Sequence, residues 1–208
     1  MYICYMFTEL HPDNPQPREI KRIADILRNG GLVIFPTDSV YALGCDIKNH
    51  RAYEQMCRIV GVKPNKAQLS LICKDLSNIS EYSTPISTPV YKLMRSTLPG
   101  PFTFILKANN SVPKIFKANR KTIGIRVPDN NIAIALVEEL GNPIVSTSIH
   151  SEDEILDYIT DPFEINEKFK NQVDEIIDGG FGDNHASTVI DVSSGEIELL
   201  RQGKGQLP

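Results

Sequence analysis

Apolar and polar positions along the chain follow two patterns, one typical of helices and the other of buried strands. In residues 17–28, Ile20, Ile23 and Leu27 recur at helical spacing and share one face. Residues 32–35 form a short continuous apolar run, which is typical of a strand buried on both faces. Segments of the two kinds interleave along most of the sequence.

These patterns predict an alternating order of elements. Helices are expected over residues 17–28, 52–60, 90–97 and 132–140, with one more after Pro162, and strands over 32–35, 69–73, 102–106, 122–127, 144–148, 173–177, 188–192 and 196–200. Alternating helices and buried strands favour a layered α/β sheet. The last three strands follow one another too closely for crossover helices, so we expect a mixed sheet.

Length and composition limit the possible classes of protein. A chain of 208 residues favours one domain over residues 1–208 with one sizeable core. The formal net charge of −4 argues against a protein that coats nucleic acid with its whole surface, but it is compatible with a local basic cleft. No run approaches the ~20 apolar residues that span a bilayer, and the start lacks signal-peptide features, so we expect a cytoplasmic protein.

Cysteines and known catalytic motifs give mostly negative indications. Cys4, Cys45, Cys57 and Cys73 form no C-x-x-C pair and have no histidine at zinc-ligand spacing, so we expect reduced, mostly buried thiols and no metal site. Nucleophile elbows, glycine-rich phosphate loops and paired carboxylates are also missing. The sequence assigns no catalytic residue.

Polar residues gather instead at the ends of the predicted strands, where open α/β sheets place their ligand crevice. Thr37 and Ser39 follow the strand at 32–35, where they either bind a ligand or stabilise a turn. Arg126 lies on the face of its strand opposite Ile125. Because its guanidinium needs a polar partner, it either forms a structural salt bridge or binds an anion.

Two further groups are less specific. Ser148, Ser187 and Arg201 stand at ends of apolar runs, where hydroxyl groups are common for structural reasons. Arg58, Lys63 and Lys66 form a basic stretch, which is either a solvated loop or a phosphate-binding segment.

Six motifs, taken together and in order, are more specific than any of these residues alone. They read PTDSVYALG, LPGPFTFIL, IGIRVP, STSI, STVIDV and LLRQGKG. In this order they resemble the signature of the YrdC-like domain family over about residues 11–205. The opening HPDNPQ and the phrases YALGCDI, TFILK and RKTIGIRVP make the chain most similar to the YciO branch. The resemblance implies a twisted open α/β sheet with helices on its faces and a large concave cleft.

The resemblance also implies a function. It indicates a protein of the translation and tRNA-modification class that binds nucleotide and double-stranded RNA and has a cleft for ATP and threonine. The better-understood branch makes L-threonylcarbamoyladenylate from L-threonine, bicarbonate and ATP, releasing pyrophosphate, for the modification of an adenosine in tRNA. A working synthase is therefore one alternative, and a non-catalytic scaffold for protein contacts is another. The implied ligands are ATP, accompanied by Mg²⁺, and tRNA or other double-stranded RNA.

The motifs carry the family's site over to individual residues. Those that would bind threonine or its carbamate are Thr37, Ser39, Arg126, Ser148 and Ser187, and those that would bind the nucleotide and its phosphates are Arg58, Lys63, Thr103 and Arg201.

Three departures from the synthase pattern concern the same site. The synthases carry K-x-R-P where this chain has Gly61-Val62-Lys63-Pro64, so one cation is missing and the other is a lysine, with Arg58 or Lys66 as a candidate substitute. His150 replaces the asparagine of S-A-N, and Ser39 replaces a threonine. We therefore expect weak synthase activity.

Overall fold

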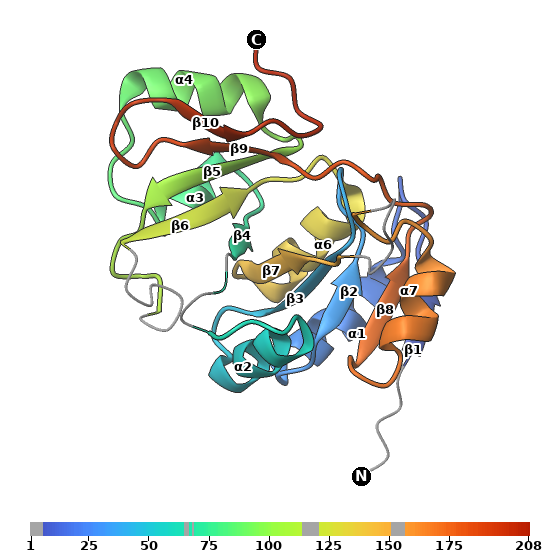
Figure 1. Cartoon of the computed structure of the whole chain (residues 1–208). Coiled ribbons are helices and arrows are strands. Elements are labelled where there is room, and N and C mark those ends of the chain that lie inside the picture. The colour runs from blue at the N-terminus through green and yellow to red at the C-terminus, as the bar shows by residue number, and fades with distance from the viewer. Residues whose placement is uncertain (1–5, 65–66, 68, 114–120, 151–156) are drawn as a thin grey trace.

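The structure, a computed structural model, describes residues 6–64, 67, 69–113, 121–150 and 157–208. These residues form a ten-stranded mixed sheet with helices on its faces (Figure 1). The helices are α1 (Pro17–Arg28), α2 (His50–Ile59), α3 (Leu76–Ser80), α4 (Thr88–Thr97), α6 (Asn131–Leu140) and α7 (Pro162–Phe169). The strands are β1 (Met6–Glu9), β2 (Val33–Phe35), β3 (Ala42–Asp46), β4 (Ser70–Ile72), β5 (Phe102–Lys107), β6 (Thr122–Arg126), β7 (Ile144–Ser148), β8 (Glu175–Asp178), β9 (Thr188–Asp191) and β10 (Glu198–Arg201).

The strand order across the sheet is β1-β8-β2-β3-β7-β4-β6-β5-β9-β10. The pairs β1–β8, β8–β2, β4–β6 and β5–β9 are parallel, and the other neighbours are antiparallel. This confirms the predicted mixed sheet. In Figure 1, α4 lies beside β5, β9 and β10 at one end of the sheet, whereas α1, α2 and α7 lie toward the other end.

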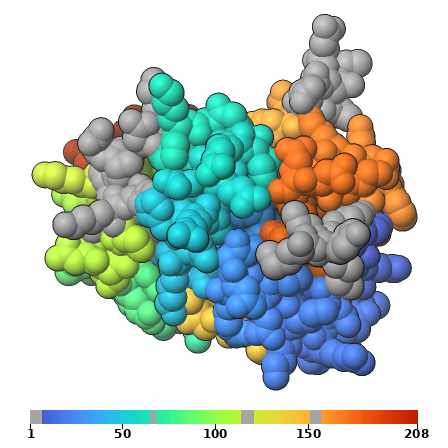
Figure 2. Space-filling model, turned by 90° about the horizontal axis from the view of Figure 1, so that it is seen from below, coloured from blue at the N-terminus to red at the C-terminus, as the bar shows by residue number. Residues whose placement is uncertain are grey.

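Helices cover both faces of the sheet around β2. Val33 and Phe35 belong to the apolar cluster that includes α1 and α6, whereas Ile34 points into the larger cluster with α2 and α7. Seen from below, the segments of α1, α2 and α7 lie side by side on the surface (Figure 2). The continuous apolar run of β2 therefore has the predicted cause, because each face of the strand packs against a helical layer.

The predicted helices and strands are all present, with bounds that differ from the prediction by at most two residues. Three elements were not predicted, namely β1, β3 and α3. β3 has the sequence ALGCD and is buried along its whole length, so its small, non-alternating residues resemble a loop. α3 has only five residues, which is too short for a helical period to be recognised.

The described cysteines are as expected. Cys45, Cys57 and Cys73 are unpaired and buried, and burial raises the pKa of each thiol. Cys4 lies outside the described residues. Within the described ranges, no helix is both long and apolar enough to cross a membrane.

Candidate functional site

A cavity of about 490 Å³ lies on the face of the sheet that α4 does not cover. Strands β3 to β7, β9 and β10 all contribute to it, so segments far apart in sequence meet there. Its lining residues are Ala42, Ala67, Leu69, Ser70, Thr103, Ile105, Thr122, Ile123, Gly124, Arg126, Ser146, Thr147, Ser148, His150, Tyr158, Ser187, Val189, Leu200 and Arg201.

The polar side chains of this lining are basic or carry hydroxyl groups. It includes two arginines, one histidine and seven Ser or Thr side chains, and no described residue that lines it is acidic. Guanidinium and hydroxyl groups favour an anion. The described lining does not fit a magnesium ion bound by protein carboxylates. No three His, Cys, Asp or Glu side chains in the described ranges are grouped to bind a metal.

Arg126 is the most constrained of the cavity's polar side chains. The strand period directs it away from Ile125, as predicted, and its side chain is 6% exposed. Its Nη2 donates to Asp38 Oδ1 and to Ser39 Oγ, each at 2.9 Å. Burial lowers the pKa of Arg126, the Asp38 carboxylate opposes that change, and the charge of Arg201 adds to it. Its Nε, although buried, has no described hydrogen-bond partner.

Of the two sequence alternatives for Arg126, the salt bridge is present, and anion binding stays a prediction. It forms a buried salt bridge with Asp38, and its side chain also lines the cavity. Asp38 is fixed in turn, because its Oδ2 accepts a hydrogen bond from the Asp129 N–H at 2.9 Å. The prediction did not single out Asp38, since a carboxylate next to Thr37 and Ser39 is also a common turn residue.

Arg201 reaches the cavity through an irregularity in β10. Leu199 pairs with Ile190, and Arg201 pairs with Val189, so Leu200 is an extra residue in the antiparallel pair. Such a bulge re-aims side chains, and both Leu200 and Arg201 line the cavity. The guanidinium of Arg201 donates to the Ser187 carbonyl, with Nη2 at 2.8 Å.

The hydroxyl residues predicted for the site fall into two groups. Thr103, Ser148 and Ser187 line the cavity, and the hydroxyls of Thr103 and Ser187 are 2.7 Å apart. Thr37 and Ser39 are buried beside it but do not line it. Thr37 donates to the Val40 carbonyl at 2.7 Å and accepts from the Ser39 N–H, which is the turn-stabilising alternative.

Only some of the predicted phosphate-binding cations line the cavity. Arg58, in α2, and Lys63, after it, are exposed and do not line the cavity. Lys66 lies outside the described residues. His150 does line the cavity, and its ring centroid lies 4.8 Å from that of Tyr158. Tyr158 was not predicted as a site residue, because it lies in an irregular polar segment of the sequence.

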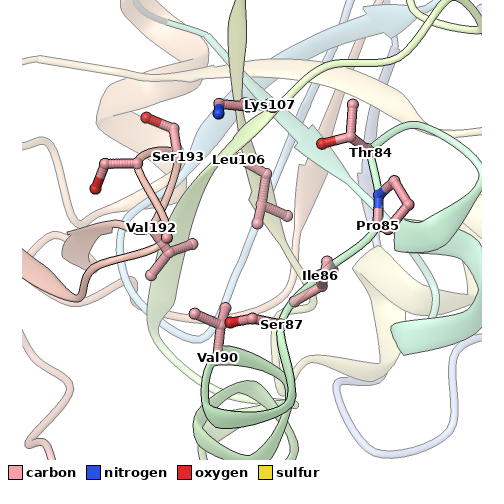
Figure 3. Close-up of a pocket in the computed structure, with 11 residues that line it drawn as sticks. Thr84, Pro85, Ile86, Ser87, Val90, Leu106, Lys107, Val192 and Ser193 are labelled. Carbon is pink, nitrogen blue, oxygen red and sulfur yellow. The ribbon is translucent and has the colours of Figure 1, made fainter.

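A second, smaller cavity of about 180 Å³ is separate from this site (Figure 3). Lys107 and hydroxyls including Thr84, Ser87 and Ser193 surround a floor that includes Leu106. Leu106 belongs to the core on the α4 side of the sheet, and no predicted site residue lies in this cavity.

Comparisons with known proteins agree with this architecture. The sequence model of the family Sua5_yciO_yrdC, described as "Telomere recombination", matches residues 25–203. The uncharacterized protein YciO of Escherichia coli (strain K12) is 43% identical over 202 residues, which are 97% of each chain. A threonylcarbamoyl-AMP synthase of Coxiella burnetii (strain RSA 493 / Nine Mile phase I) is 33% identical over 175 residues, covering 84% of this chain and 92% of the synthase.

Solved structures give the same result. The crystal structure of E. coli YciO superimposes with a TM-score of 0.90 at 42% identity and 97% coverage of both chains. The crystal structure of P. abyssi Sua5 complexed with L-threonine gives a TM-score of 0.85 at 26% identity, covering 95% of this chain and 57% of Sua5. The chain therefore belongs to the Sua5/YciO/YrdC family.

Proposed function

We propose that the cavity binds a nucleotide of the ATP class, with phosphate oxygens bound by Arg126 and Arg201. The carrying observation is the lining, in which the two arginines stand among seven Ser or Thr side chains and no described acidic residue. The volume of about 490 Å³ also suits a small molecule.

Calorimetric titration with ATP, AMP and adenosine tests this proposal. Because the two guanidiniums would contact phosphate, affinity should fall from ATP to AMP and again to adenosine. Replacing Arg201 with methionine should weaken ATP binding much more than adenosine binding. Equal affinity for ATP and adenosine would contradict a phosphate site.

A second candidate is the synthesis of L-threonylcarbamoyladenylate. The C. burnetii synthase at 33% identity and the Sua5 structure with L-threonine favour it. We expect slow turnover, because Arg58 and Lys63 lie outside the cavity and a triphosphate there would lack their charge. The assay is pyrophosphate release that depends on ATP, L-threonine and bicarbonate together. Turnover of ~1–10³ per second would show a fully competent synthase instead.

A third candidate, RNA binding, rests on the exposed cations outside the cavity. Arg58, Lys63 and Lys121 are exposed, and none forms an ion pair with a described residue. Such cations suit phosphate contacts, which position RNA without reading its sequence. Binding of tRNA or another RNA duplex should therefore weaken steeply with salt, and the double variant R58M/K63M should reduce the salt dependence. Salt-independent binding would exclude this mode.

A further inference from the structure

The segment that follows β10 returns to the site. Residues 202–205, here called the C-terminal strap, follow β10 and lie against the start of β9. The Lys204 N–H donates to the Ala186 carbonyl at 2.9 Å, and the Gly203 N–H donates to Thr188 Oγ1 at 2.9 Å. A Cβ at Gly203 would lie 2.2 Å from the Ala186 carbonyl oxygen, so this close approach requires glycine.

The strap directs the side chain of Lys204 across the sheet, onto the loop between β2 and β3. Lys204 Nζ donates to the Asp38 carbonyl oxygen at 2.7 Å and lies 2.9 Å from Asp183 Oδ2. The Asp183 N–H donates to the Ser39 carbonyl at 2.9 Å. The carbonyls of Asp38 and Ser39 are therefore both fixed from outside their own loop, one by Lys204 and one by its ion-pair partner.

Asp183 is electrostatically suited to this arrangement. Burial alone would raise the pKa of Asp183, but hydrogen bonds from Lys204 and His185 outweigh it and lower the pKa to about 2. The carboxylate is therefore ionised, and paired with Lys204, at any physiological pH.

The side chains of Asp38 and Ser39 are the ones that bind Arg126 Nη2. Their direction depends on the backbone that Lys204 and Asp183 fix. We propose that Lys204 is a positioning residue, which fixes the Asp38–Ser39 loop so that Arg126 faces the ligand cavity. This inference rests on the proposed function, because it gives Lys204 a role in binding at that cavity.

If the Lys204–Asp183 ion pair served only to stabilise the fold, its loss would mainly lower the stability of the protein. Lys204 and Asp183 are partly exposed, at 42% and 28%, and exposed pairs of this kind contribute little to global stability. The loop they hold, in contrast, carries both side chains that bind Arg126. The loss of Lys204 should therefore weaken ligand binding much more than it weakens the fold.

The experiment compares K204M, K204R and the matched control K92M in the full chain. Lys92 is exposed on α4 and forms no ion pair with any described residue, so K92M removes the same charge elsewhere. K204M should raise the Kd for ATP about tenfold, because the loop that binds Arg126 would no longer be fixed. It should also speed amide hydrogen exchange at Ser39 and Asp129, with little change in the urea midpoint. K204R should restore both readouts, because arginine also donates to a carbonyl and a carboxylate.

Three outcomes are decisive. Unchanged exchange and unchanged ATP affinity in K204M would overturn the positioning role. An equal loss of affinity in K92M would do the same, because it would show a non-specific charge effect. If the wild type binds no ATP but K204M still speeds exchange at Ser39 and Asp129 while K204R does not, the nucleotide proposal fails and the loop-positioning role remains.

Discussion

Arg126 and Asp38 form a buried pair, so neither can be removed without affecting the other. Their side chains are 6% and 7% exposed. Arg126→Ala would leave the Asp38 carboxylate buried without its cation, and breaking such a pair typically costs about 3–5 kcal/mol. We expect a loss of that size in the free energy of unfolding measured with urea, together with weaker ATP binding.

A double variant separates these two effects. D38N/R126M removes both charges, so it should recover most of the unfolding free energy while ATP binding stays weak. If the double variant recovered ATP binding as well, Arg126 would have no part in ligand recognition.

His150 supports a second residue-scale prediction. Its ring lies against Tyr158 in the cavity, where an exposed imidazole face can stack on a nucleobase. Such stacking contributes about 1–3 kcal/mol per base. His150→Ala should weaken ATP binding by that amount and leave the affinity for inorganic triphosphate unchanged, as measured by calorimetry. An equal loss for both ligands would point to a charge effect rather than stacking.

At the scale of elements, α6 connects the site strand to the core. Its N-cap is Asn130, which lies four residues after Arg126 in the sequence. The Asn130 side chain accepts a hydrogen bond from the Ala133 N–H at 3.0 Å. Asn130→Ala should lower the free energy of unfolding by about 1 kcal/mol, whereas Asn130→Asp should retain the cap. Urea denaturation checks both values. Equal destabilisation by the two variants would show that the cap contributes nothing.

The sequence predicted α1, α6 and the central strands well, because their apolar patterns are regular and their ends carry clear signals. Gly141 is an example, since it ends α6 in the left-handed conformation at φ 77°. β3 was missed because Gly44 and Asp46 interrupt its apolar run, and its residues do not alternate either. The bulge in β10 has no local sequence signal either, since it depends on how β10 pairs with β9.

For the whole molecule, Asp183 gives a test of stability against pH. Its pKa is about 2 in the folded protein, below the ordinary value of 3.8. Because the folded pKa is depressed, the stabilisation from its charge is present above about 3.8 and is lost as the pH falls toward 2. The urea stability of the wild type should therefore exceed that of D183N by up to about 1 kcal/mol near pH 6.

This difference should shrink between pH 4 and pH 2. Glu175 acts in the opposite direction, because burial raises its pKa, but it is common to both proteins and cancels in the comparison. A difference that stayed constant down to pH 2 would show that Asp183 is not paired in solution.

The sequence by itself determined the order of the described elements other than β1, β3 and α3, the mixed α/β class and the family, because these follow from local periodicity and from motifs in fixed order. It also identified five of the residues that line the cavity, namely Thr103, Arg126, Ser148, Ser187 and Arg201. Only the tertiary structure decided that Arg58 and Lys63 lie outside the cavity, that Asp38 pairs with Arg126, and that Lys204 reaches the same loop. The physical reason is distance along the chain: Asp38 and Lys204 are 166 positions apart, and only the folding of the sheet brings them into contact.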